Sequence, residues 1–599
     1  MLFKRINGFK VIVYTTSIIS LLLVIATIGS WYLSYKIKPV LTRELKVLVN
    51  NSTDQLYNVE FSDINLNFLT GNATFNDVRI FSNEKRYKKL VEQKKAPDNL
   101  YELTLKKLQL RRFHPLKFYF NNEIEVQKLI FHQPSLTMLN KNFVYNRNLR
   151  PAPRISPYQF ISKFASKLDI QEISLKSVRF KYVDLNGFNP IIDSINNLNI
   201  VGKAYLVDEN SAQDTSRIYL FKEINFSVSN QSYFTSDDFY NIKFDKLSYT
   251  TKSGKLILKG LNVIPLYNEE KFGRIAGFAK DRLTINVNTL EFEQLSLPNF
   301  IANQEIIADK LNITSGKIIV HADNRLPQKI RNYVPLFPHQ LLQQFPHTIN
   351  IKETELKDID VTYSEFDRDS YTKGEIDFFK TSGKFFNITN DSLAKTLNPI
   401  ANADLTTYLM GSGKLDLKIN FYLNSRNGLF DIDGKMGPIN GKLLNRITRP
   451  IGMMQIASGD VNSLTFNFEA TEKIARGKME LKYQDLNLKV LTRDKEGNRL
   501  KKNLLASFLI NNLVVEESNP TKGSAVRKVD FVNNRNLSAS FFNYLWKTLF
   551  VGIKSSVGVT PQKELEISNK FETFESIKGY LDNMKSNKEK RQQRNSPKK

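Results

Sequence analysis

Apolar residues recur at one fixed spacing in four places along the chain. Counted from the first residue of each copy, they fall at offsets 0, 3, 5, 10 and 12, with a polar threonine at one position. Steps of two residues keep side chains on one face of a strand, so the pattern predicts repeated β-units with one apolar face. The copies are Val126, Leu129, Phe131, Leu136, Met138; Ile170, Ile173, Leu175, Phe180, Tyr182; Ala308, Leu311, Ile313, Ile318, Val320; and Ile351, Thr354, Leu356, Val361, Tyr363.

The spacing also suggests how each unit is built. A step of three residues indicates a β-bulge, and the residues at offsets 6 to 9, such as Thr314 to Lys317, predict a turn. We therefore expect each unit to be a hairpin. A long sheet of such hairpins needs a second layer, closure into a tube, or an apolar ligand on its apolar face. An ordinary β-sandwich gives the same pattern, so a protein core and a lipid groove both stay open.

An uncharged run, 11–33, lies near the N-terminus. At about 1.5 Å per residue it would span roughly 35 Å, enough for a hydrocarbon core of about 30 Å. Basic residues precede it, and Trp31 and Tyr32 stand where interfacial anchors are expected. We expect residues 1–10 to be cytoplasmic and 11–33 to form one transmembrane helix. A cleaved signal peptide is the alternative, but the run is longer than its usual apolar region and no small-x-small site follows.

The charge pattern limits the possible partners. The net charge is +26, and the basic residues are concentrated in 84–117 and in 585–599. Elsewhere Lys and Arg alternate with apolar residues, as on the solvated face of a sheet, so no nucleic-acid partner is expected. An anionic membrane surface remains a compatible partner. The chain has no cysteine, which excludes disulfides, Cys-ligated metals and thiol nucleophiles.

The sequence carries no recognisable catalytic or metal-binding motif. The five histidines lack metal-ligand spacing. Gly411 to Lys414 and Gly437 to Lys442 resemble phosphate-binding loops but lack the required gap and the Ser or Thr after the lysine, so turns are expected there. We predict that the protein is not an enzyme, with no catalytic residues, no metal ligands and no cofactor.

The pattern changes after Gly428. Strands are expected at Phe430 to Gly434, Leu464 to Phe468 and Met479 to Leu488. Between the first two, five apolar residues recur at helical spacing and predict a short helix that interrupts the sheet. These are Leu443, Leu444, Ile447, Ile451 and Met454.

This region resembles the C-terminal region of AsmA-like proteins of Gram-negative bacteria, especially the Bacteroidetes type. Arg446 stands where the family often has proline. AsmA-like proteins are similar to bridge-like lipid-transfer proteins, in which repeated β-units form a long open channel with an apolar floor between two membranes. The matching residues are Gly434-Lys435-Met436-Gly437, Leu444-Asn445, Pro450, Ile456-Ala457-Ser458-Gly459, Ala475-Arg476-Gly477 and Tyr483-Gln484-Asp485-Leu486.

The resemblance implies a mainly β fold. The N-terminal transmembrane helix would be followed by an elongated, twisted, repeating β-sheet with an open, taco-like groove over 34–427 and short interrupting helices. The AsmA-like C-terminal β region would cover 428–535. The candidates for lining a lipid groove are the apolar repeat positions Val126, Leu129, Phe131, Ile170, Ile173, Leu175, Leu311, Ile313, Ile318, Leu356 and Val361.

An amphipathic helix is expected over 536–558, followed by a basic, disordered tail over 566–599. The helix has adjacent pairs of apolar residues every four positions. It can lie on a membrane or a partner, or it can plug the end of the groove as core, and both alternatives stay open. Its apolar residues are Phe541, Phe542, Leu545, Trp546, Leu549, Phe550 and Ile553.

Three functions remain for the structure to address. The first is transfer of phospholipid or another lipid between inner and outer membranes, which would contribute to outer-membrane biogenesis. It implies a single-pass protein of the bacterial inner membrane with its bulk in the periplasm and a possible outer-membrane or periplasmic protein partner. The second is an interaction scaffold or chaperone for outer-membrane protein assembly. The third is binding of polyanions through residues 85–117.

Overall fold

The computed structural model describes residues 32, 34–36, 38–147, 156–162, 165–327, 336–494, 500–503, 507, 515–537, 540–559 and 563. The predicted cytoplasmic residues 1–10, the transmembrane helix over 11–33 apart from Tyr32, and the basic tail over 566–599 lie outside these residues. Within the described residues, no helix has the length and apolar character needed to span a membrane.

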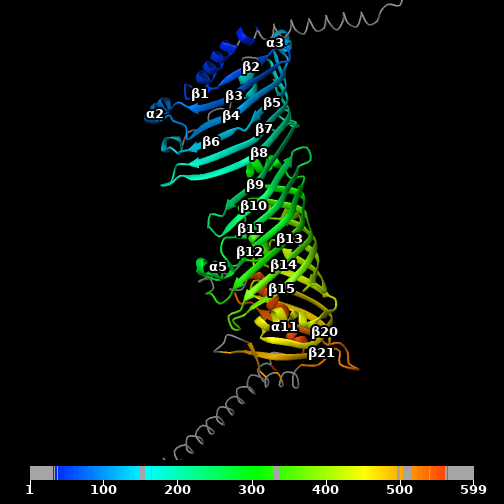
Figure 1. Ribbon diagram of the computed structural model, residues 1–599. Coiled ribbons are helices and arrows are strands. Elements are labelled where there is room, and N and C mark those ends of the chain that lie inside the picture. Colours follow the sequence, from blue (N-terminus) through cyan, green and yellow to red (C-terminus); the bar gives the residue numbers. More distant parts are fainter. Residues whose placement is uncertain are drawn as a thin grey trace, which may run out of the picture. The chain divides into compact units, whose positions relative to one another are not determined.

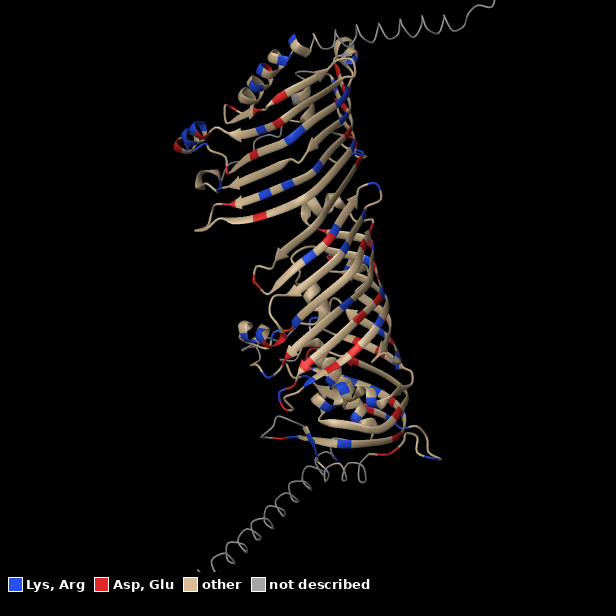
Figure 2. Ribbon diagram, viewed as in Figure 1, with Lys and Arg blue, Asp and Glu red and all other residues tan. Residues whose placement is uncertain are grey.

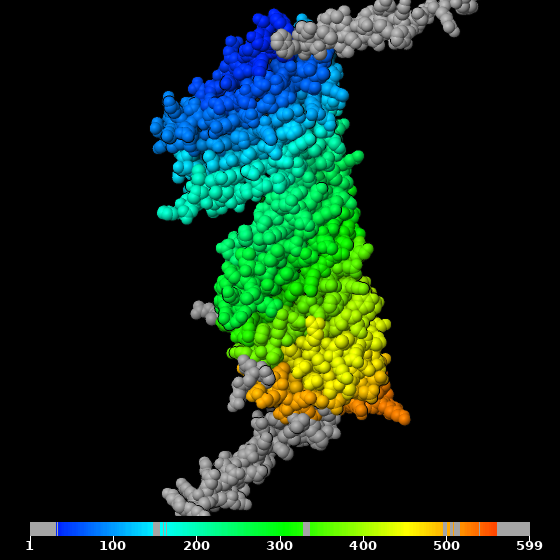
Figure 3. Space-filling model, in the orientation of Figure 1, coloured from blue at the N-terminus to red at the C-terminus, as the bar shows by residue number. Residues whose placement is uncertain are grey.

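The predicted β-rich fold is confirmed, because the described strands form one mixed sheet of 23 strands. The chain divides into two compact units, each described here by itself. Unit 1 comprises residues 1–231 and 244–257, and unit 2 comprises 232–243 and 258–599. Within each unit, strands that follow one another in the sequence are stacked in order, so the colour changes steadily over the surface (Figure 3).

Unit 1 is a curved sheet with short helices in its connections (Figure 1). Residues 38–52 are helical. The elements are β1 (Tyr57–Glu60), β2 (Asp63–Asn67), β3 (Asn72–Ser82), α2 (Glu84–Glu92), β4 (Asn99–Phe113), α3 (Pro115–Asn121), β5 (Glu123–His132), β6 (Ser135–Asn140), η1 (Val144–Asn146), α4 (Pro157–Ile161), β7 (Lys167–Asp184) and β8 (Ile191–Val207). The boundary between the units passes through β9 (Glu223–Phe234), β10 (Tyr240–Thr250) and β11 (Lys255–Pro265).

Unit 2 continues the strand pattern and ends on a long helix. Its first elements are α5 (Glu269–Ala276), β12 (Arg282–Glu293), α6 (Leu297–Asn303), β13 (Ile306–Asp323), α7 (Pro338–Gln343), β14 (Ile349–Phe366), β15 (Lys373–Thr389), α8 (Ser392–Leu397), β16 (Ile400–Leu409) and β17 (Gly413–Tyr422). There follow β18 (Phe430–Met436), β19 (Ile439–Asn440), η2 (Gly441–Leu444), α9 (Asn445–Gly452), β20 (Met454–Ala470), β21 (Ile474–Arg493), β22 (Leu500–Lys502), β23 (Lys528–Asn534) and α11 (Phe541–Ser556).

The sequence repeat appears in the structure as parallel pairing in register. β5 and β6 both pair with β7, so that Val126 lies opposite Ile170 and Leu136 opposite Phe180. β13 pairs with β14 in the same way, with every repeat position of one strand opposite its counterpart in the other. Antiparallel pairing joins other neighbouring strands, such as β7 with β8 and β12 with β13. Two copies with the same spacing therefore lie on neighbouring parallel strands.

The prediction that each copy of the sequence repeat is a hairpin is wrong. β7, β13 and β14 each run through 18 residues, and the turn predicted at Thr314 to Lys317 lies inside β13. The residue at offset 7 has a left-handed backbone in all four copies. The φ angles are 49° at Gln133, 54° at Ser177, 52° at Ser315 and 54° at Asp358.

A left-handed residue inside a strand makes a bulge, which shifts the alternation of side chains without reversing the chain. The five-residue step between offsets 5 and 10 therefore marks a bend. The first copy is divided into β5 and β6 at Pro134, which has no N–H to donate to the ladder. Pairing nonetheless continues through this point, because Gln133 N donates to Lys176 O (2.8 Å) and Arg179 N to Pro134 O (2.8 Å).

The predicted helix between the C-terminal strands is confirmed. η2 and α9 cover Gly441 to Gly452, whereas Met454 already begins β20. Arg446, at the position where the AsmA-like pattern often has proline, donates to Glu375 Oε2 (2.6 Å) and pairs with Asp377, both on β15. The helix is thus held to the sheet by a charge pair.

Gly434 on β18 lies between Leu417 and Phe466 on the neighbouring strands. A Cβ atom at position 434 would lie 2.1 Å from the Phe466 ring, so the ring covers the glycine backbone. Only a residue without a side chain leaves room for this ring.

We expect Gly434→Ala to lower the free energy of unfolding by about 1–3 kcal/mol, because the added methyl forces the Phe466 ring out of its position. Gly437→Ala is the matched control, since the nearest atom to its added Cβ would be Lys414 O at 3.8 Å. Urea denaturation of both variants measures the difference. Equal stability of the two variants would contradict this account of Gly434.

Candidate functional site

The repeat positions of unit 1 from offset 3 onward lie on one face of the sheet, called the inner face below. Directly paired residues point to the same side of a sheet, and the printed register carries apolar side chains from strand to strand. One row, from β3 to β9, is Phe75, Leu108, Phe131, Leu175, Ile200 and Phe226. The next row is Ala73, Leu110, Leu129, Ile173, Gly202 and Ile224. The apolar surface therefore runs across the strands without a break.

Unit 2 has the same arrangement over more strands, and its inner face is named in the same way. One row, from β12 to β23, is Leu290, Ile313, Leu356, Gly383, Leu405, Leu417, Gly434, Phe466, Met479 and Val529. A parallel row begins with Phe292 and Leu311 and ends with Phe468, Gly477 and Phe531. No charged residue interrupts the first row.

The rows differ in how far protein covers them. The main buried apolar cluster gathers residues of β17 to β23 beneath α11. Two smaller clusters surround Val320 and Tyr363 in unit 2 and Val78 and Leu105 in unit 1. Over β5 to β8 and over the middle of β12 to β14, the described residues include no second sheet and no helix that forms a layer on the inner face. There the apolar face lacks a protein partner among the residues that the structure describes. At the ends of β13 and β14, Ile447 of α9 and Trp546 of α11 pack against the cluster around Val320 and Tyr363.

Nine of the predicted groove residues lie on this face, and the other two, Val126 and Ile170, are paired with each other three residues before the row of Leu129. Val126 and Ile170 are buried, and the other nine are half-buried. Phe131 touches the small cluster of unit 1, and Ile318 touches that around Val320. The structure thus brings four of the candidates together on this face in unit 1 and five in unit 2. The inner face also includes offset 8, which the sequence pattern missed, with Val178 and Ile359 both buried. The sequence signal for this position was that two of the four copies, the second and the fourth, have an apolar residue at offset 8.

α11 closes the inner face of unit 2 at its C-terminal strands (Figure 1). Its most deeply buried residues are Tyr544, Thr548, Gly552 and Ser556, a stripe of mostly small residues. A Cβ atom at Gly552 would lie 2.7 Å from the Met479 side chain, and Thr548 Oγ1 accepts a hydrogen bond from Asn533 (2.8 Å). The small stripe therefore allows the helix to approach β21 and β23 closely.

The apolar residues predicted for this helix flank the small stripe. Four of them pack against the main cluster: Phe541, Leu545, Leu549 and Ile553. Trp546 packs against the cluster around Val320. The ring of Phe550 stacks on the ring of Trp546, with 5.8 Å between their centroids. Phe542 stacks on Tyr363 at 5.9 Å but is 42% exposed. Of the two placements considered from the sequence, the structure shows the helix within the core of unit 2.

Acidic groups gather where α11 begins. Glu365 is buried and accepts hydrogen bonds from Tyr363 Oη (2.7 Å) and from Asn543 Nδ2 (3.0 Å). Burial raises the pKa of Asp281 to about 6, and the nearby Glu365 charge adds to the effect. Burial also raises the pKa of Tyr363 well above its ordinary value. The described residues hold no group of three or more His, Asp or Glu that suits a metal ion.

The raised pKa of Asp281 predicts a pH-dependent stability. A carboxyl group whose folded pKa exceeds its unfolded value stabilises the fold fully below the unfolded pKa, here 3.8, and this contribution is lost as the pH rises through about 6. We expect Asp281→Asn to reduce the fall in melting temperature between about pH 4 and about pH 7. Differential scanning fluorimetry measures the melting temperature at each pH, with Asp369→Asn at an exposed site as control. An unchanged pH profile would contradict the assignment.

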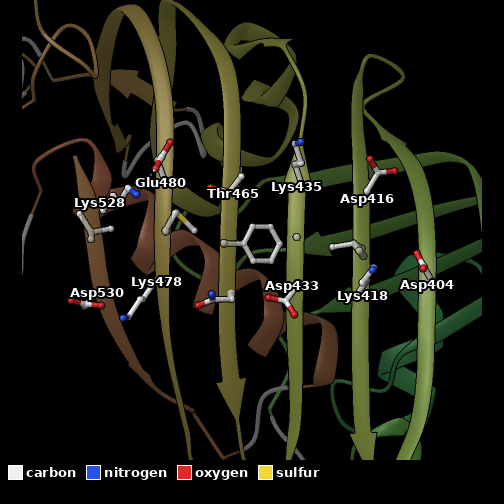
Figure 4. Close-up of a pocket in the computed structure, with 16 residues that line it drawn as sticks. Asp404, Asp416, Lys418, Asp433, Lys435, Thr465, Lys478, Glu480, Lys528 and Asp530 are labelled. Carbon is white, nitrogen blue, oxygen red and sulfur yellow. Dashed lines mark ion pairs between the residues drawn. The ribbon is translucent and has the colours of Figure 1, made fainter. Parts of the chain in front are cut away.

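The opposite, outer face of these strands is polar and electrically balanced. A depression on this face is lined by both acidic and basic residues (Figure 4). One row across the strands is Lys384, Asp404, Lys418, Asp433, Asn467, Lys478 and Asp530, in which the two signs alternate. Figure 2 shows the two signs interspersed over the strands. Such a surface has no charge excess with which to hold an anion.

No protein-family model matches this chain, and a search of curated proteins gives no match. The resemblance to AsmA-like proteins therefore stays a prediction. The geometry of the inner face is the main basis for a function.

Proposed function

We propose that this protein is anchored in the bacterial inner membrane by residues 11–33 and binds and transfers phospholipid between inner and outer membranes. Its bulk would lie in the periplasm, and its activity would contribute to outer-membrane biogenesis. The inner face would bind the acyl chains, and no chemistry on the lipid is required. The observation that supports this proposal most is the apolar inner face of β5 to β8 and of the middle of β12 to β14, over which the described residues form no second layer.

Apolar surface left in water costs about 25 cal/mol per Å², and large exposed apolar patches are typical of binding surfaces. Acyl chains are a suitable cover, because Thr354 is the one hydrogen-bonding side chain in these rows and the other members are apolar residues or glycine. At about 4.8 Å between strands, the six-strand row of unit 1 is about 24 Å long. This length exceeds the ~15 Å of one leaflet of a 30 Å hydrocarbon core.

The outer face supports the same proposal. Its alternating charges keep that side of the sheet in water, so the two faces of one sheet suit two different surroundings. In the resembling AsmA-like proteins, a comparable apolar floor is associated with a lipid channel. A protein scaffold for outer-membrane assembly would instead require that another polypeptide cover the inner face.

Photo-crosslinking of the full chain in cells separates these two functions. We expect a photoreactive phenylalanine analogue at Leu175 or Leu356 to form phospholipid adducts, because both positions lie on the inner face. The adjacent exposed residues Lys176 and Lys357 are matched controls and should form none. Mass spectrometry of the purified chain identifies the adducts.

Each outcome of this experiment decides between the candidates. Phospholipid at both inner positions and at neither control supports lipid binding along the face. Adducts with another protein at the inner positions, without lipid, would favour the scaffold and exclude the lipid proposal.

A further inference from the structure

α3 is a short helix whose apolar side chains face solvent. It connects β4 to β5 and has the sequence Pro-Leu-Lys-Phe-Tyr-Phe-Asn. Leu116 is 70% exposed, Tyr119 81% and Phe120 74%, and the rings of Tyr119 and Phe120 contact each other at 5.1 Å between centroids. Four large apolar residues within five positions is more than a solvated connection requires. A helix with this surface needs an apolar partner.

α3 lies where the described chain begins. Ser34 Oγ donates to Leu66 O (2.7 Å) at the end of β2, and the turn after β2 reaches Gly71, whose carbonyl accepts from Phe113 N (2.8 Å). Phe113 is two residues before α3, and its ring lies 6.3 Å from that of Phe118 on the helix. Figure 1 likewise shows α3 beside β2 at one end of unit 1. The uncharged run 11–33 directly precedes Ser34 in the sequence.

The surface beside α3 is basic. Arg111 and Arg112 are exposed and line a depression with polar residues of β3 and β5. Lys117 on the helix is neutralised by Glu125, with which it pairs. The two arginines therefore give the positive charge next to the aromatic residues. Aromatic residues flanked by basic ones are typical of segments that lie in the interface of an anionic membrane.

We propose that α3 inserts Leu116, Tyr119 and Phe120 into the interface of the membrane that residues 11–33 span, with Arg111 and Arg112 at its anionic head groups. This inference rests on the anchoring proposed above and adds a second contact with the same bilayer. A single spanning helix leaves unit 1 free to rotate and tilt, whereas a second contact fixes its orientation. The start of β5 is thereby held at the head groups.

The absence of cysteine allows this to be tested on the full chain. A single cysteine, Tyr119→Cys, labelled with an environment-sensitive fluorophore, is reconstituted in vesicles of phosphatidylethanolamine and phosphatidylglycerol that contain a spin-labelled lipid. Phe188→Cys is the matched control, because Phe188 is a fully exposed aromatic residue beyond the other end of β7. We expect a blue shift and several-fold stronger quenching at position 119 than at position 188. Quenching at position 119 should weaken when phosphatidylcholine replaces phosphatidylglycerol.

A third variant, Ser20→Cys, reports on the anchor separately. Quenching at position 20 without quenching at position 119 would overturn the role of α3 and leave the anchor intact. A blue shift at position 119 without quenching by the spin-labelled lipid would show that protein covers α3, and would overturn the inference too. Quenching at position 119 alone would support α3 as a membrane contact and contradict the proposed anchor.

Discussion

The structure depends on keeping one face of a bent strand apolar over its full length. A strand of 18 residues that alternates strictly is nearly straight, and a bend requires an extra residue. In each repeat the left-handed residue at offset 7 supplies the bend, and the apolar positions resume at offset 8 on the same face. Because neighbouring copies pair in register, their bends lie side by side. The curvature of each unit and the continuity of its apolar rows have the same origin.

The two ends of the inner face in unit 2 differ in how far protein covers them. Beneath α11 the rows become an ordinary protein core, with Phe430, Phe468 and Phe531 buried. At β12 to β14 the same rows are half-buried among the described residues, apart from the buried Thr354. Where α11 begins, the buried Glu365 is held by Tyr363 on the sheet and Asn543 on the helix. A polar network thus joins the sheet to the start of the covering helix.

Much of this arrangement could be predicted from the sequence, because alternation and repetition are local properties. The apolar face, the four copies and the short helix at α9 were all predictable. The hairpin interpretation failed, since a polar stretch such as Thr314 to Lys317 is equally compatible with a turn and with a bulge. Only the partner strand decides between them, and parallel pairing across 43 or 44 residues is not visible in the local pattern. Burial of α11 on its small stripe was likewise hidden, because its apolar pairs are the more prominent feature.

The charged rows of the outer face have a consequence for how the strands find their partners. A slip of one residue exposes the apolar face to water, but a slip of two residues preserves it and is the harder error to avoid. β17 carries Asp416 and Lys418, which oppose Lys435 and Asp433 on β18. A two-residue slip would place Lys418 opposite Lys435, or Asp416 opposite Asp433, and like charges directly opposite each other are destabilising. The same holds for Lys478 and Glu480 against Asp530 and Lys528. The charged outer face of the sheet therefore selects the register, which the apolar inner face alone would leave ambiguous.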